Sequence, residues 1–129
     1  MKILQPPGWP RPRGYSNGIE ASGRMVFVAG MIGWDAKERI VSEDLVAQIR
    51  QALQNTVAVL AEASALPADI ARMTWFVTDR SEYLNRAREI GEVYREVLGA
   101  HYPAMALVVV AGLLEEGAKV EIETTAVVP

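Results

Sequence analysis

Cysteine is absent from the 129-residue sequence, and histidine occurs only once, as His101. The absence of cysteine excludes disulfides, thiolate metal sites and cysteine nucleophiles. A zinc site or a serine–histidine–aspartate triad would need further partners at suitable spacings, and the sequence offers none. We therefore expect no metal and no cofactor, and we interpret His101 as a structural or solvated loop residue.

Basic residues are also scarce, since 13 lysines and arginines stand against 16 aspartates and glutamates and the net charge is −3. Nucleic-acid-binding proteins normally carry a basic stripe, so we expect no nucleic acid partner. No apolar run approaches the length of a membrane span, and the first residues lack the apolar core of a signal peptide. These absences favour a cytoplasmic protein without a membrane partner.

The residues that are present suit a globular protein, because 50% of them are hydrophobic and 22% are charged. Length and composition together predict a single domain over residues 1–129. Closely spaced prolines between Pro6 and Pro12 exclude regular structure from Gln5 to Arg13. The chain should therefore begin with an extended lead-in.

The first half of the chain predicts a hairpin, a helix and a strand. Two β-prone runs, Tyr15–Glu20 and Arg24–Met31, lie on either side of a short polar turn and predict the hairpin. The hydrophobic period then becomes helical, with Ser42 as the expected N-cap. Ile70–Thr78 is rich in β-branched and aromatic residues, which predicts a strand buried on at least one face.

The second half predicts one more helix and two strands. Asp79 has the spacing of a helix-capping residue, and Gly99 has the usual position of a helix end. The unbroken apolar run Ala104–Ala111 suits a strand covered on both faces. Lys119–Val128 alternates polar and apolar residues, and we expect a tight polar turn at residues 115–117 to join these two strands.

This order of elements predicts an α+β fold in which two helices cover one face of a mixed sheet. The other face would stay uncovered, and the residues expected on it are too apolar for a monomer. We therefore expect the chain to associate with copies of itself.

Six short stretches of the sequence are informative together in their order and spacing. They are Gly14-Tyr15-Ser16-Asn17, Val26-Phe27-Val28-Ala29-Gly30, Gln51-Ala52-Leu53-Gln54-Asn55, Thr74-Trp75-Phe76-Val77-Thr78-Asp79, Tyr102-Pro103-Ala104 and Lys119-Val120-Glu121-Ile122-Glu123. In this order they resemble the Rid family of reactive intermediate deaminases, whose members are often labelled L-PSP endoribonucleases. The resemblance covers nearly the whole chain, and no single stretch is specific on its own.

The resemblance implies a chorismate-mutase-like fold and a homotrimer with three clefts between subunits. It also implies that Glu121 is the acid that orients the hydrolytic water, although paired acids on a strand, here Glu121 and Glu123, are usually only a solvated face. Tyr15 takes the place of a cleft tyrosine; from the residues alone it would be an aromatic at a strand start. The remaining substrate-binding positions implied by the resemblance are Ala29, Gly30, Met31, Gly91 and Met105.

Four of those positions depart from the pattern of the active deaminases. Ala29 and Met31 stand where many members have serine and glutamine, and Gly91 falls where many have asparagine. Met105 follows the Pro-Ala pair where the deaminases have an arginine that holds the substrate carboxylate. Methionine supplies no donor, and it could line a cleft or fill the core. Another arginine could take over, and the candidates on nearby segments are Arg11, Arg13, Arg88 and Arg95.

Two functions remain open from the sequence. The first is hydrolysis of an imine or enamine, on a small substrate other than the usual amino-acid-derived enamines. The second is a non-catalytic trimer that binds a small molecule or a protein in the same clefts. The ribonuclease activity in the older family label is a weaker third hypothesis, because the chain is acidic and has a single histidine.

Overall fold

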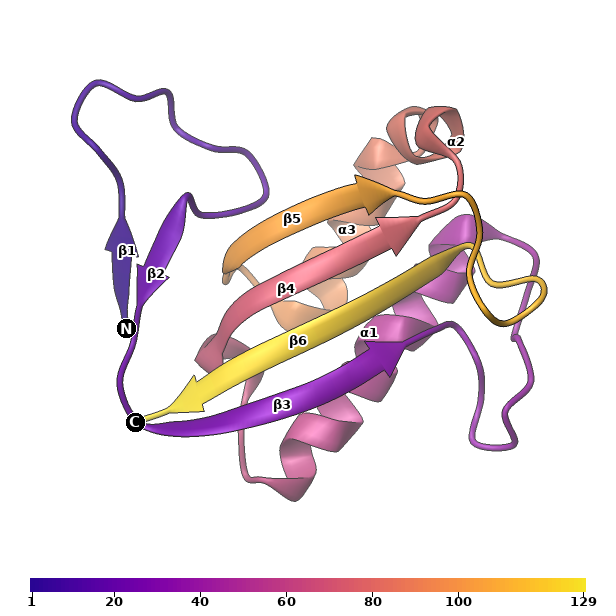
Figure 1. Cartoon of the computed structure of the whole chain (residues 1–129), viewed down its shortest axis with the longest axis horizontal. Helices are drawn as coiled ribbons and strands as arrows, with labels where there is room; N and C mark the ends of the chain where they lie inside the picture. Colours follow the sequence, from indigo (N-terminus) through magenta and orange to yellow (C-terminus); the bar gives the residue numbers. More distant parts are fainter.

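A four-stranded mixed sheet forms the centre of the protein, and the computed structural model describes all residues from 1 to 129. Helices α1 (Leu45–Glu62) and α3 (Ala87–Leu98) cover one face of the sheet and leave the other face open (Figure 1). This arrangement confirms the predicted α+β fold with two helices on one face. The strands lie in the order β3 (Arg24–Met31), β6 (Val120–Val128), β4 (Ile70–Val77) and β5 (Ala104–Val109).

Alternation along the central strands decides which side chains enter the core. On β4, Met73, Trp75 and Val77 point toward the helices and are at most 1% exposed. Thr74 and Phe76, between them, point to the open face and are only half-buried. Each large apolar side chain that is fully buried contributes about 1.5–3 kcal/mol of transfer free energy, so this face holds the sheet against the helices.

The first helix begins at a different residue from the one predicted. Asp44, not Ser42, is the N-cap, and its carboxylate accepts a hydrogen bond from the Ala47 backbone at 2.9 Å. The Ser42 hydroxyl instead accepts from the Asp44 backbone at 3.0 Å, which stabilises the turn before the helix. Both are good capping residues, so spacing alone could not choose between them.

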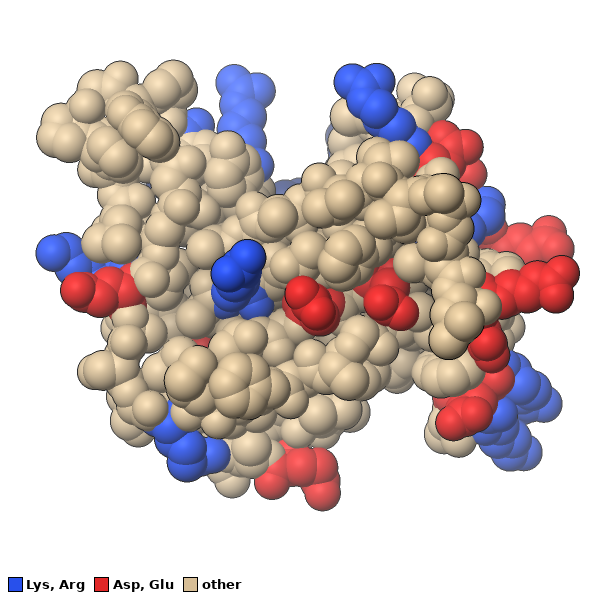
Figure 2. All heavy atoms as spheres, viewed as in Figure 1, with Lys and Arg blue, Asp and Glu red and all other residues tan.

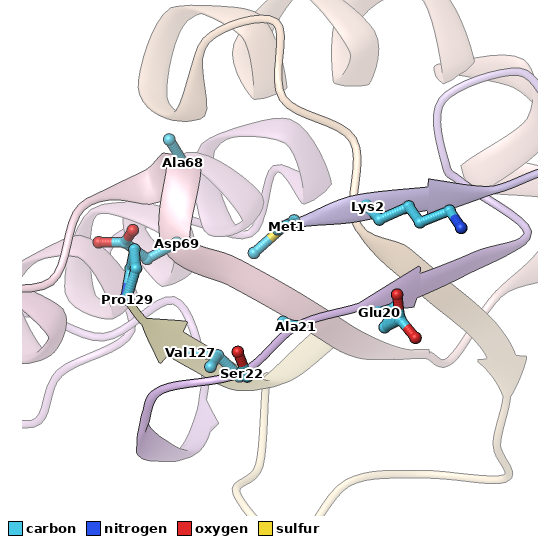
Figure 3. A pocket seen from close by; sticks show the side chains of 9 residues that line it. All are labelled: Met1, Lys2, Glu20, Ala21, Ser22, Ala68, Asp69, Val127 and Pro129. Atoms are coloured by element: carbon cyan, nitrogen blue, oxygen red, sulfur yellow. The ribbon is translucent and has the colours of Figure 1, made fainter.

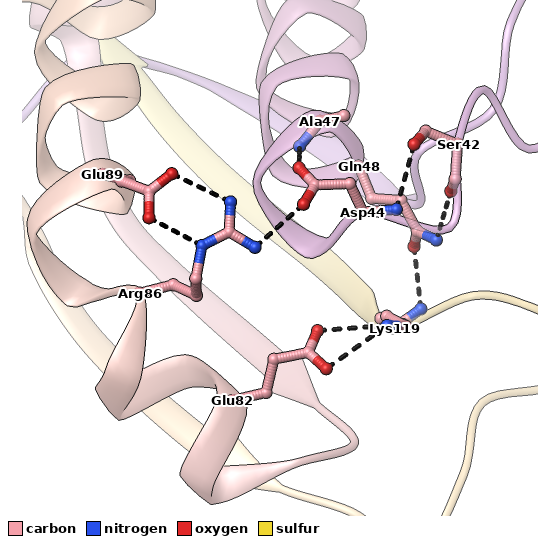
Figure 4. A network of polar contacts seen from close by, with 8 residues as sticks. All are labelled: Ser42, Asp44, Ala47, Gln48, Glu82, Arg86, Glu89 and Lys119. Atoms are coloured by element: carbon pink, nitrogen blue, oxygen red, sulfur yellow. Dashed lines mark hydrogen bonds and ion pairs between the residues drawn. The ribbon is translucent and has the colours of Figure 1, made fainter.

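The predicted second helix is divided in two. Asp79 caps α2 (Arg80–Asn85) as expected, but the helical backbone breaks at Arg86, where φ is −107° and ψ is 12°. The Arg86 guanidinium donates to Glu89 at 2.7 Å and to Asp44 at 2.8 Å, which ties the break to the start of α1 (Figure 4). These hydrogen bonds from Arg86 lower the pKa of both carboxyl groups.

The N-terminal hairpin pairs differently from the prediction. β2 (Gly18–Glu20) pairs with β1 (Lys2–Leu4) and not with β3. The proline-rich lead-in turns back on itself, and the Asn17 amide donates to the Gln5 side chain at 2.7 Å. Gly23, at φ 144°, then leads the chain into β3 so close to β6 that a Cβ would lie 2.2 Å from the Val128 carbonyl oxygen.

The two C-terminal strands are both present but are not neighbours, which corrects the predicted tight connection. β4 lies between them, parallel to β5 and antiparallel to β6, so the chain crosses over the end of β4 in residues 110–119. The polar turn is a small part of this crossover, with the Ala118 backbone donating to the Glu115 carbonyl at 3.1 Å. β5 also ends at Val109 and forms an exposed edge, although its apolar sequence predicted a strand covered on both faces.

The crossover is anchored by Gln48, which lies in the first turn of α1. The Gln48 side chain is fully buried and its amide donates to the carbonyls of Ser42 and Gly117 at 2.8 and 2.9 Å. Its carbonyl accepts from the Lys119 backbone at 2.8 Å (Figure 4). Two segments that are far apart in the sequence, the turn before α1 and the crossover, therefore meet on one side chain, which fixes where β6 begins.

Candidate functional site

Glu121 and Gly30 meet on the open face of the sheet. Glu121 is half-buried on β6, and a Cβ built on Gly30 of β3 would lie 2.8 Å from the Glu121 Cδ. The two strands are irregular at this point, because their register shifts between Val28 and Met31. Only glycine leaves room for the carboxylate here, so the local backbone sets where Glu121 lies.

The Glu121 carboxylate forms no ion pair and no hydrogen bond within the chain. Glu123 lies on the same face and is more exposed, and Arg72 of β4 lines the same shallow cavity as Glu123. Figure 2 shows anionic and cationic side chains in a row across the middle of this face. A free carboxylate of this kind can accept a proton or orient a water molecule.

The other positions predicted on β3 lie beside this pair. Ala29 is exposed next to Gly30, and Met31 is half-buried opposite Ile122 of β6. Ile122 is fully buried on the helix side, so Met31 takes the opposite face from Glu121. Ala29, Gly30 and Glu121 therefore form one local group, with Met31 at the edge of the core.

Met105 and Tyr15 lie elsewhere, on a cavity of about 520 Å³ along the edge strand β5. Met105 is paired with Met73, is half-buried and packs against the core from the edge of the sheet. Met105 therefore lines a cavity and also packs against the core, which are the two roles that the sequence left open. The cavity is lined by Arg13, Tyr15, Arg80, Tyr83, Leu84, Met105, Leu107 and Val109.

Gly91 lies on a second cavity, of about 340 Å³, which adjoins the first because both are lined by Arg13, Tyr83 and Met105. We call the two cavities together the β5 groove. In the second cavity, the rings of Tyr94 and Tyr102 stack with centroids 5.3 Å apart. The remaining lining residues are Gly14, Trp75, Ala87, Ile90 and Arg95.

The predicted site residues therefore fall into two groups within one chain. Glu121, Gly30 and Ala29 lie on the open face of β6 and β3. Tyr15, Gly91 and Met105 line the β5 groove on the side of α2 and α3. β4 separates the two groups, and the two cavities that Tyr15, Gly91 and Met105 line include neither Glu121 nor Gly30 nor Ala29.

His101 has a structural role, in agreement with its interpretation from the sequence. Its Nε2 atom lies 2.7 Å from the Ile70 carbonyl oxygen, and donation to that oxygen fixes the start of β4. Its own carbonyl accepts a hydrogen bond from the Tyr94 hydroxyl, whose pKa is raised by burial. His101 therefore joins the end of α3 to the sheet.

The largest hollow of the molecule, about 740 Å³, contains none of the predicted residues. It lies between the N-terminal hairpin and the end of β6, and Figure 3 shows its polar side chains apart from one another. Asp69 is beside Pro129, whereas Lys2 and Glu20 lie on the hairpin strands. Without converging polar groups, this hollow offers no chemistry.

Sequence reasoning missed several residues of the β5 groove. Arg80 and Tyr83 belong to α2, and no sequence pattern indicated that this short helix would lie beside β5. Arg13 and Arg95 had been considered as replacements for the missing arginine, and both line the groove, whereas Arg11 and Arg88 do not. No helix has both the length and the apolarity that crossing a bilayer requires.

Known proteins resemble this chain over almost its whole length. The family model described as Endoribonuclease L-PSP matches residues 10–128. A 2-iminobutanoate/2-iminopropanoate deaminase of Salmonella typhimurium is 36% identical over 116 residues, which are 88% of this chain and 86% of that protein. A RutC family protein of Pyrococcus horikoshii is 35% identical over 91% of this chain and 90% of its own.

Solved structures give the same result. The Rid family protein YyfB of Yersinia pestis superposes with a TM-score of 0.87 at 32% identity, covering 98% of each chain. The structure of Escherichia coli TdcF with bound serine superposes with a TM-score of 0.70 at 34% identity and covers each chain completely. The sequence resemblance, the fold and these matches agree, and the chain belongs to the Rid family.

Proposed function

We propose that this protein hydrolyses a small imine or enamine in clefts that form between the subunits of a homotrimer. The proposal rests mainly on the free Glu121 carboxylate, which Gly30 holds on an open sheet face. The curated relative from Salmonella typhimurium is named as an imine deaminase, which supports this class of reaction. The substrate would differ from the usual amino-acid-derived enamines because Met105 offers no donor to a carboxylate.

Assembly would bring the two groups of site residues together. The open sheet face carries exposed apolar side chains, among them Met25 at 57%, Phe27 at 71% and Val108 at 40% exposure. Exposed apolar patches of this kind usually mark protein interfaces. If this face packs against the β5 edge of a neighbouring subunit, Glu121 of one chain would approach Tyr15 and Met105 of the next.

Glu121 would act on water in such a cleft. As the water oxygen attacks the carbon of a protonated imine, the carboxylate accepts a proton and a carbinolamine forms. The carboxylate returns that proton to the amino nitrogen, the C–N bond breaks with its electron pair going to nitrogen, and the released ammonia takes the hydroxyl proton as the carbonyl forms. Ammonium and a carbonyl compound are the products, so water supplies the new oxygen and no cofactor is needed.

The presence of Met105 in place of the family arginine affects which substrates can bind. Losing the charged partner of a buried carboxylate costs about 2–5 kcal/mol, which would remove useful affinity for a ligand anchored at this position. The lining around Met105 is largely apolar and aromatic. A substrate with an apolar body therefore fits better than a small imino acid.

The experiment compares Glu121→Gln with the wild type on imines generated from a panel of amines, with ammonia release as the readout. The matched control is Glu123→Gln, which removes a carboxylate from the same face two residues away. Activity should disappear in Glu121→Gln and persist in Glu123→Gln, with both variants folded and equally assembled. Full activity in Glu121→Gln would overturn the proposal.

One observation favours the alternative of a non-catalytic binding module. The two cavities of the β5 groove together are lined by four tyrosines and a tryptophan, while no carboxylate lines either cavity. A ligand could bind there without reaching Glu121. In that case ligand affinity would be measurable, no imine would be turned over, and Glu121→Gln would change neither result.

A further inference from the structure

Three arginines in the β5 groove have no partner within the chain. Arg13, Arg80 and Arg95 form no ion pair and no side-chain hydrogen bond. No aspartate or glutamate lines either cavity, although acidic residues outnumber basic ones in the chain. The groove is therefore locally cationic in an acidic protein, which favours an anionic ligand.

We infer that the β5 groove binds carboxylates with an aromatic or bulky apolar body, and that Arg95 and Arg13 supply the anchor that residue 105 lacks. The inference rests on the proposed function in one respect, since it names the substrate class of that site. It also makes a claim of its own, because binding in the groove does not require turnover.

The position of Arg95 on α3 allows its side chain to act as the anchor. Its guanidinium lies over Gly91, one turn earlier, with Nη1 3.5 Å from the position of a Cβ on that residue. Other arginines next to or on α3 are neutralised by glutamates, as in Arg88 with Glu92. Arg95 has glycine four residues away on both sides, so this helix offers it no such i,i+4 partner.

Arg13 and Arg80 reach the first cavity from different elements, because Arg13 belongs to the N-terminal segment and Arg80 begins α2. Figure 2 shows cationic side chains on both sides of a notch in the upper outline of the molecule. Arginine binds carboxylates through two parallel hydrogen bonds, which gives it a geometric preference for such ligands.

The groove also specifies the body of the ligand. Between the arginines its lining consists of tyrosines, Trp75, Met105 and aliphatic side chains. Its cavities, of about 520 and 340 Å³, fall in the range of small-molecule sites. A short carboxylate held at Arg95 would leave the apolar side chains of β5 uncovered, whereas an aromatic one would pack against them.

Calorimetric titration of the assembled protein tests this selectivity with three probes. Phenylpyruvate has both the carboxylate and the aromatic body, pyruvate lacks the aromatic body, and phenylacetone lacks the carboxylate. Phenylpyruvate should bind at least about tenfold more tightly than either of the others, since one charge-assisted hydrogen bond can account for such a factor. Equal binding of phenylacetone would overturn the inference, as would the absence of phenylpyruvate binding.

Variants identify the anchor. Arg95→Gln and Arg13→Gln should each weaken phenylpyruvate binding by about tenfold and leave phenylacetone binding unchanged. Arg88→Gln is the matched control, because Arg88 lies on the same helix, pairs only with Glu92 and does not line the groove. If both groove variants bind like the control, the arginines are not the anchor.

The same titrations separate this inference from the proposed catalysis. Phenylpyruvate binding and imine turnover are both measured on the wild type, so that each result can be obtained without the other. Binding with no turnover in the wild type would leave the inference standing and contradict the proposed function. Turnover of imines with no effect of the arginine variants would contradict the inference alone.

Discussion

Gly30 and Glu121 are in contact across β3 and β6, and a Cβ at residue 30 would lie 2.8 Å from the Glu121 Cδ and 2.9 Å from its Oε2. Ordinary Cβ atoms do not approach other heavy atoms this closely. The contact involves the flexible end of the glutamate, so a larger residue at position 30 would move the carboxylate before it moved the backbone. The position of the proposed catalytic group thus depends on one glycine.

Gly30→Ala should therefore reduce imine hydrolysis strongly while leaving the fold and assembly intact. We expect a loss of at least about tenfold in kcat/KM, because a small displacement of a general base is costly. Gly112→Ala is the control, since a Cβ there would meet nothing within 4 Å. Equal activity in both variants would show that the Glu121 carboxylate does not need its present position.

The open sheet face predicts the state of assembly. Light scattering should give the mass of a homotrimer at micromolar concentration, and Phe27→Glu should yield monomers because it places a charge on the exposed apolar face. Val59→Glu is a useful comparison, since Val59 is 38% exposed on the outer side of α1. A wild-type monomer would leave the exposed apolar face without an explanation.

Small enamines derived from serine or threonine should be poor substrates. Their carboxylate has no donor at Met105, and they lack the apolar body that the β5 groove can accommodate. A coupled assay that generates 2-aminoacrylate measures this directly. Turnover as fast as that of an arginine-bearing family member would mean that another residue already holds small carboxylates.

The Arg86 network predicts how stability depends on pH. Arg86 lowers the folded-state pKa of Asp44 and of Glu89, so the stabilising contribution is present at neutral pH and is lost as pH falls through those lowered values. Arg86→Ala should lower the Tm at pH 7, and its difference from the wild type should shrink in acid below about pH 4. A difference that stays constant down to pH 2 would contradict this account.

Periodic features of the sequence were predictable, and long-range pairings were not. The alternation of Ile70–Val77 and the cap at Asp79 depend on neighbouring residues, and both appear in the structure as expected. The pairing of β1 with β2, the insertion of β4 between β5 and β6, and the helix break at Arg86 depend on contacts between distant segments. An apolar run such as Ala104–Val109 has the same sequence signature whether it fills a central strand or an edge that another subunit covers.

The residues of the candidate site likewise include some that the sequence could predict and some that it could not. Glu121 could be singled out from its strand position and from the family resemblance, but its contact with Gly30 required the register of β3 on β6. Arg80 and Tyr83 could not be found from the sequence, since no local pattern indicates that α2 lines the same cavity as β5. Arg13, Arg95 and Met105 were candidates from the sequence, whereas the groove residues contributed by α2 were not.

Met105→Arg tests both the placement of this residue and the effect of its departure from the family pattern. Met105 is half-buried, lines both cavities of the β5 groove and packs against the core only from the sheet edge, so a longer side chain can extend into the groove. We expect a folded, assembled variant that gains affinity for small carboxylates such as 2-oxobutyrate, measured by calorimetry, through a bidentate pair.

Met73→Arg is the contrasting variant, because Met73 is the strand partner of Met105 but is fully buried. An unpaired charge there should cost about 3–5 kcal/mol of stability. If Met105→Arg is as insoluble as Met73→Arg, residue 105 belongs to the core, and the groove cannot be the place where this protein holds its ligand.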